Sequence, residues 1–154
     1  MHKTLLIIAH APSDNTRAML NAIRKGANDQ LVDNIKVRVL TPLETQANDI
    51  ISADAIIIGT TENLGYMSGL VKDVFDRCFY DCLEKTNGLA FTFYIRAGND
   101  GTGTKKAIES ITTGLKWRLV QAPLVCTGDF KPEFLDQCEK LGLKIAASLD
   151  ADII

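Results

Sequence analysis

Residues 55–69 read AIIIGTTENLGYMSG, an unbroken apolar run that passes directly into a loop with spaced glycines. An apolar run without alternating polar residues is typical of a strand buried on both faces of a parallel sheet. Residues 5–9, which read LLIIA, have the same character. The two runs therefore predict two strands of a sheet that helices cover on both faces.

Apolar residues recur at helical spacing outside these runs, as in Val71, Val74, Phe75 and Cys78. The predicted strands are 5–9, 36–40, 55–59, 89–95 and 119–126, and the predicted helices are 15–27, 43–52, 71–82, 108–115 and 132–149. Because parallel neighbours need crossover connections, this alternation predicts an α/β fold with a five-stranded parallel sheet between two helical layers.

The composition fits one ordinary domain spanning residues 1–154, with 46% hydrophobic and 23% charged residues. The 17 Lys and Arg against 19 Asp and Glu give a net charge of −2, which lacks the basic footprint that nucleic-acid binding needs. The apolar run at 5–9 is too short for a signal peptide or a membrane span. We therefore expect a cytoplasmic protein with no nucleic-acid partner and no membrane span.

The four cysteines, Cys78, Cys82, Cys126 and Cys138, match no zinc-ligand spacing. A chain of this size folds without disulfides, so we expect reduced thiols that are buried as small apolar side chains, and no metal site.

Parallel sheets bind ligands beyond the carboxyl ends of their strands, which directs attention to loops 10–16, 60–68 and 96–104. The first loop places Ser13, Asn15 and Thr16 at a helix N-terminus, where free amides and the helix dipole favour a phosphate. Ser13 or Asn15 could instead only cap the helix. His10 could face the ligand, or could be a strand-end histidine bonded to backbone.

The second loop offers glycines whose backbone can approach a flat ligand edge-on, and Tyr66, Leu64 or Met67 could cover its face. The alternative is a turn that leads into a capped helix, with Tyr66 on the surface.

One stretch carries a specific resemblance to a known family. Its residues are Gly59, Thr60, Gly65, Met67, Ser68, Gly69, Lys72, Phe75, Asp76 and Arg77. Together with the preceding phosphate-type loop, the stretch resembles the flavodoxin-like superfamily, and most of all its tryptophan-repressor-binding-protein and NAD(P)H-dependent FMN reductase or quinone reductase branches. The resemblance implies a flavodoxin-like three-layer sandwich with strand order 2-1-3-4-5 and FMN as cofactor.

The resemblance also implies which residues hold FMN. These are His10, Ser13, Asn15 and Thr16 in the first loop, Thr60, Thr61, Glu62, Asn63, Leu64, Gly65 and Tyr66 in the second, and Arg96, Ala97, Gly98, Gly101 and Gly103 in the third. Arg96 would stabilise negative charge at N1 and O2 of the reduced flavin; its alternative role is a surface salt bridge. Asp14 departs from the family's phosphate loops, which often have glycine there, and has to point away from a phosphate.

The function expected from these residues is that of an FMN-binding oxidoreductase, which passes electrons from NAD(P)H through the flavin to a quinone or similar acceptor. The flavin carries the chemistry, and we find no separate catalytic constellation of side chains. A neighbouring subunit of a homo-oligomer could complete the substrate pocket.

Three alternatives belong to other classes. The first is a flavodoxin-type carrier that has no turnover of its own and serves a redox protein. The second, a domain that has lost its cofactor and acts in binding, is motivated by Asp14. A phosphoacceptor receiver domain is disfavoured, because His10 and Thr60 stand near the strand ends where such a domain needs acidic residues.

Overall fold

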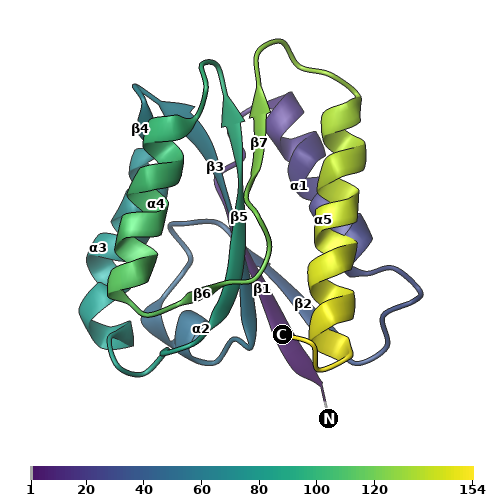
Figure 1. Cartoon of the computed structure of the whole chain (residues 1–154), viewed down its shortest axis with the longest axis vertical. Helices are drawn as coiled ribbons and strands as arrows, with labels where there is room; N and C mark the ends of the chain where they lie inside the picture. Colours follow the sequence, from purple (N-terminus) through teal and green to yellow (C-terminus); the bar gives the residue numbers. More distant parts are fainter. Residues whose placement is uncertain (1) are drawn as a thin grey trace.

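The computed structural model describes residues 2–154 and contains one twisted sheet with helices packed on both faces (Figure 1). The strands are β1 (Lys3–Ala9), β2 (Ile35–Leu40), β3 (Ala55–Asn63), β4 (Tyr66–Met67), β5 (Ala90–Ala97), β6 (Arg118–Leu119) and β7 (Leu124–Thr127). The helices are α1 (Asp14–Ala27), α2 (Ala47–Ile51), α3 (Gly69–Cys82), α4 (Thr102–Gly114) and α5 (Glu133–Asp150). Among these residues no helix is both long enough and apolar enough to cross a membrane.

The main strands lie in the order β2, β1, β3, β5 and then β6 with β7, and all of these pairings are parallel. This confirms the predicted order 2-1-3-4-5, with β5 as the fourth strand and β6 with β7 as the fifth. The carboxyl ends of these strands point to the top of Figure 1. The three loops singled out in the sequence therefore meet at one edge of the sheet.

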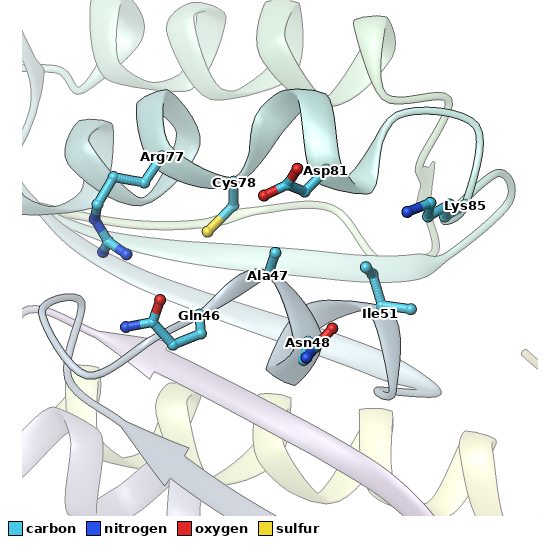
Figure 2. Close-up of a pocket in the computed structure, with 8 residues that line it drawn as sticks. All are labelled: Gln46, Ala47, Asn48, Ile51, Arg77, Cys78, Asp81 and Lys85. Atoms are coloured by element: carbon cyan, nitrogen blue, oxygen red, sulfur yellow. The ribbon is translucent and has the colours of Figure 1, made fainter.

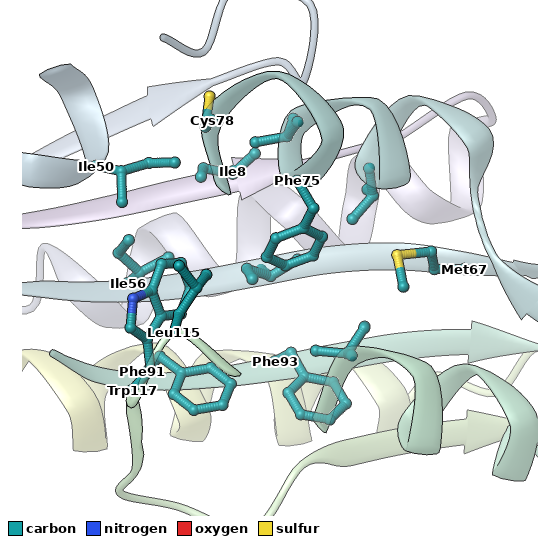
Figure 3. Packing of buried hydrophobic residues seen from close by; sticks show 14 of the residues in the cluster. Ile8, Ile50, Ile56, Met67, Phe75, Cys78, Phe91, Phe93, Leu115 and Trp117 are labelled. Carbon is teal, nitrogen blue, oxygen red and sulfur yellow. The ribbon is translucent and has the colours of Figure 1, made fainter. Parts of the chain in front are cut away.

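Alternating side chains of each strand feed two separate cores, because successive residues of a strand point to opposite faces. Leu5, Ile7 and Ile57 are buried against α1 and α5. Residues at the intervening positions, such as Ile56 and Phe91, are buried under α2, α3 and α4 (Figure 3). Burial on both faces explains the unbroken apolar runs of the two central strands.

The predicted strand at 119–126 is wrong as a continuous element, because the chain leaves the sheet between β6 and β7. Phe91 pairs with Leu119 and Tyr94 pairs with Leu124, so the edge strand carries two more residues than its partner over this stretch. Pro123 lies in the interruption and has no amide to donate to a strand neighbour. The first helix, by contrast, begins and ends within a residue of its prediction.

Thr104 gives a stability prediction, since its hydroxyl is fully buried at the start of α4 and has no hydrogen-bond partner among residues 2–154. A buried hydroxyl without a partner is destabilising, so Thr104→Val should raise the free energy of unfolding by about 1 kcal/mol. Thr112 is the matched control on the same helix, because its buried hydroxyl donates to the Ile108 carbonyl at 2.9 Å. Thr112→Val should bring no such gain. Urea unfolding of both variants measures the difference, and equal effects would contradict the prediction.

Candidate functional site

The second loop is a β-hairpin that extends beyond the sheet. Strand β3 continues to Asn63, the chain turns at Leu64 and Gly65, and β4 returns antiparallel with Asn63 opposite Tyr66. Both turn residues have positive φ, 52° and 76°, as a two-residue type I′ hairpin turn requires. The prediction of a loop over 60–68 is therefore wrong for residues 60–63 and 66–67, which form strands, and holds at the turn between them. The side chain of Leu64 is fully exposed and Tyr66 is 40% exposed, so the hairpin carries apolar side chains at its tip.

Glu62 joins this hairpin to the third loop. One of its carboxylate oxygens accepts a hydrogen bond from the Asn99 amide and the other accepts one from the Gly101 amide, each at 2.8 Å. The first turn of α4 also lies against the hairpin, because a Cβ added to Gly103 would lie 2.1 Å from the Gly65 carbonyl oxygen. The structure thus brings the second and third loops together, and Glu62 holds them.

The first loop uses two of its predicted ligands in a capping box at the start of α1. The Ser13 hydroxyl accepts from the Thr16 amide at 3.2 Å, and the Ser13 amide donates to the Thr16 hydroxyl at 2.9 Å. The capping alternative raised for Ser13 is what the structure shows. Asp14 is almost fully exposed and pairs with Arg17, so its carboxylate points outward.

Two backbone donors at this helix start are left for a ligand. Within residues 2–154, the amides of Asp14 and Asn15 donate to no acceptor, as is usual for the first turn of a helix. The side chain of Asn15 is exposed beside them. These donors and the positive end of the α1 dipole suit an anionic group.

His10 links the first loop to β3, because its backbone amide donates to the Gly59 carbonyl at 3.0 Å. Burial lowers the pKa of its imidazole, which favours the neutral form at pH 7. The neighbouring Gly59 is required by packing, since a Cβ there would lie 2.3 Å from the ring of Tyr94. Tyr94, which no sequence pattern singled out, lies buried beneath this corner of the site. A tyrosine inside an apolar strand gives no signal of its own.

Thr60 and Thr61 serve the hairpin itself. The buried Thr60 hydroxyl accepts from the Ser68 amide at 3.0 Å and donates to the Thr61 carbonyl at 2.9 Å, which fixes the start of α3 against β3. The Thr61 hydroxyl donates to the Asn63 side chain at 2.8 Å. Of this pair, the partly exposed Thr61 is the one a ligand could reach.

Arg96 lies on the side of β5 that faces α5. Its Nη1 donates to the carbonyls of Ala97 and Cys126 at 2.9 and 3.1 Å, and its guanidinium lies over the rings of Phe130 and Phe134. The surface salt bridge considered for Arg96 is not formed within residues 2–154. A role beside a flavin ring stays a prediction for this residue.

Three glycines leave the backbone unobstructed at the edge where the loops lie. A Cβ added at Gly65, Gly69 or Gly98 would meet nothing within 4 Å, so the backbone is open to an approaching group at all three positions. Gly101 differs, because its φ of 72° and the nearby Val125 side chain require glycine there for the turn into α4. Gly69 and Gly98 are therefore open positions, Gly101 is a structural one, and Gly65 is both, since its φ of 76° serves the hairpin turn.

A separate cavity of about 320 Å³ lies between α2 and α3, away from the three loops (Figure 2). The guanidinium of Arg77 at its rim already donates to the carbonyls of Thr45 and Pro42 and to Asp73. Burial raises the pKa of the Cys78 thiol that faces this cavity, which opposes a reactive thiolate. These side chains serve packing between the two helices.

Comparison with known proteins supports the expected family resemblance. No model of a known protein family matches the chain. A flavodoxin of Aquifex aeolicus is 24% identical, over 92% of this chain and 84% of its own length. A solved flavodoxin from the domain Archaea superposes with a TM-score of 0.77 at 18% identity, covering 95% of this chain and 98% of its own. A flavodoxin, WrbA-like protein from Agrobacterium tumefaciens gives a TM-score of 0.67 at 15% identity, covering 97% and 98%. The chain therefore has the flavodoxin-like fold.

Proposed function

We propose that this chain is an FMN-binding redox protein whose cofactor lies at the edge formed by the three loops. The observation that carries the proposal is the Glu62 bridge, which holds the second and third loops together at the same edge of the sheet as the free amides of α1. The related proteins named above, which are flavodoxins or described as flavodoxin-like, support it further.

The donor set at the first loop fits the phosphate of FMN. The amides of Asp14 and Asn15 and the exposed Asn15 side chain supply donors, while the capping box of Ser13 and Thr16 fixes the direction in which these amides point. The outward Asp14 carboxylate leaves the amides accessible. This orientation of Asp14, which pairs with Arg17, supports phosphate binding at the amides.

The hairpin and the third loop fit the flat ring. The open backbone at Gly65 and Gly98 permits close edge-on approach, and the exposed Leu64 and Tyr66 provide apolar surface for a ring face. When bound there, FMN would accept a hydride and pass electrons on. The protein itself would then have to hold the flavin ring in place and shield it from water.

For the electron donor and acceptor, we propose that electrons come from NAD(P)H and pass to a quinone-like acceptor. The resemblance to the reductase branches of the superfamily supports this, as does the WrbA-like structural neighbour. A net charge of −2 also gives little long-range electrostatic attraction to a protein partner, which favours a small-molecule acceptor. The second candidate is a carrier without turnover that serves a redox protein, which the flavodoxin relative of Aquifex aeolicus favours.

Titration of the purified chain with FMN, followed by flavin fluorescence, tests the site. Asn15→Ala should weaken FMN binding about tenfold, because a hydrogen bond to a charged group is lost. Asn48→Ala is the matched control, since Asn48 is also the second residue of a helix but lines the cavity between α2 and α3. Equal affinity in both variants, or no FMN binding by the wild type, would contradict the proposed site.

Activity assays of the FMN-loaded protein distinguish the reductase from the carrier without turnover. Oxidation of NADH or NADPH with a quinone, faster than with free FMN, is the outcome expected for the reductase. Turnover no faster than free FMN would overturn the reductase assignment and favour the carrier.

A further inference from the structure

The side chain of Tyr94 extends from β5 across the sheet toward β1. Strand β3 lies between these two strands, and a Cβ added to Gly59 of β3 would lie 2.4 Å from the Tyr94 hydroxyl oxygen. The end of the tyrosine side chain therefore lies over Gly59, on the face of the sheet that α1 and α5 cover. There it shares a core with Ala9 of β1 and Met19 of α1. Its hydroxyl is thus turned toward the strand whose end leads into the first loop.

The Tyr94 hydroxyl has no hydrogen-bond partner within residues 2–154, although only 4% of the residue is exposed. The hydroxyl of a tyrosine buried to this extent usually finds a partner. Over the same residues, the Thr104 oxygen is the one fully buried side-chain oxygen or nitrogen without a partner, so the Tyr94 oxygen keeps some contact with solvent. The hydroxyl is therefore a donor that a ligand from outside the chain can meet.

The same corner of the sheet holds the start of α1. The His10 amide donates to the Gly59 carbonyl at 3.0 Å, so the glycine under the Tyr94 side chain also anchors the first loop. Helix α1 begins shortly afterwards, with the free amides of Asp14 and Asn15 in its first turn. An anion at this corner would therefore meet backbone donors from the helix and the Tyr94 hydroxyl from the sheet.

The protonation state of Tyr94 suits a role beside an anion. Burial raises the pKa of its hydroxyl, so the group keeps its proton at pH 7. The hydroxyl can then donate a hydrogen bond to a phosphate and does not place a second negative charge beside it. A phosphate monoester has three acceptor oxygens, which is enough for the two amides and for a further donor.

We propose that the Tyr94 hydroxyl donates a hydrogen bond to the phosphate that binds at the start of α1, and that Tyr94 thereby favours a phosphorylated flavin over one without phosphate. The inference rests on the proposed FMN site and adds to it a side chain from the middle of the sheet. It also gives Gly59 a second role, because any larger residue there would occupy the place of the hydroxyl.

Titration of Tyr94→Phe with FMN and with riboflavin tests the inference, because the substitution removes one oxygen and riboflavin is FMN without its phosphate. The variant should bind FMN about tenfold more weakly than the wild type, since a hydrogen bond to a charged group is lost. Its affinity for riboflavin should be unchanged. Tyr80→Phe is the matched control and should alter neither affinity, because Tyr80 is an exposed tyrosine on α3, which covers the opposite face of the sheet.

The outcomes separate this inference from the proposed function. A wild type that prefers FMN to riboflavin, with the same FMN affinity in Tyr94→Phe, would overturn the inference alone and retain the FMN site. Equal weakening of both flavins in Tyr94→Phe would also overturn it, because the hydroxyl would then act on the ring. So would a lower free energy of unfolding of ligand-free Tyr94→Phe in urea, which would reveal a structural bond of the hydroxyl. A wild type that binds neither flavin, or binds both equally, would overturn the phosphate site and this inference with it.

Discussion

Replacing Glu62 with glutamine is expected to release the third loop from the hairpin. A glutamine side chain offers one acceptor oxygen and turns an NH₂ group toward the second backbone amide, so at most one of the two 2.8 Å bonds survives. Because each bond is made to a charged but partly exposed group, opening of the loop should become easier by about 2 kcal/mol. The amides of Asn99 and Gly101 should then exchange with solvent about 30 times faster, which hydrogen exchange followed by NMR measures.

FMN affinity should fall in parallel if the proposed site is right. A ligand that binds only the closed loop loses affinity in proportion to the closed fraction, so the dissociation constant should rise by at most about 30-fold, the limit that is reached when the open form predominates in the variant. Asp129→Asn makes the same chemical change at an exposed carboxylate that has no partner among residues 2–154, and it should alter neither measurement. Bound FMN that fails to slow the exchange of the Asn99 and Gly101 amides in the variant would retain the clamp and remove the third loop from the cofactor site.

Gly142→Ala should cause a large loss of stability. Its Cβ would lie 2.1 Å from the Ile23 carbonyl oxygen and 3.1 Å from the Ala27 nitrogen, and both are backbone atoms of α1. Backbone cannot rotate away as a side chain can, so α1 and α5 have to separate. We expect a loss of about 3 kcal/mol in the free energy of unfolding, despite the higher helix propensity of alanine.

Gly114→Ala is the control for this substitution. It changes glycine to alanine at the end of α4, where the new Cβ would lie 3.4 Å from the Phe79 ring, an ordinary contact. Propensity should then dominate, with a gain of up to about 1 kcal/mol. Urea unfolding of both variants should therefore show changes of opposite sign, and a stable Gly142→Ala protein would contradict the close approach of the two helices.

Sequence patterns predicted the layers of this fold because its central strands are buried on both faces. The apolar runs at residues 5–9 and 55–59 indicate such burial. A helix between two successive strands indicates that the strands are parallel. The pattern could not predict that β3 continues past Gly59, since the hairpin depends on two positive φ angles, one of them at a leucine. Proline at position 123 was the available signal for the broken edge strand.

The sequence predicted which loops lie together at one edge of the sheet, but it did not predict which hydrogen bonds each polar side chain of these loops makes. Loops at the carboxyl ends of strands are found from element order alone, whereas the partner of a polar side chain depends on the distances between loops. Glu62 was expected to line a ring, which stays a prediction, and the sequence did not indicate that it bonds two amides of the third loop. Ser13 and Thr16 bond each other because the helix start satisfies its own amides first.

The contact between α1 and α5 bears on how the molecule assembles during synthesis. The face covered by α2, α3 and α4 consists of elements that leave the ribosome one after another, so its core can form as the chain grows. The opposite face cannot close until Glu133–Asp150 has been made, although α1 emerges near the start. Until then α1 exposes Met19 and Ile23, and a nascent chain stalled before α5 should be a target for chaperones that bind apolar helices.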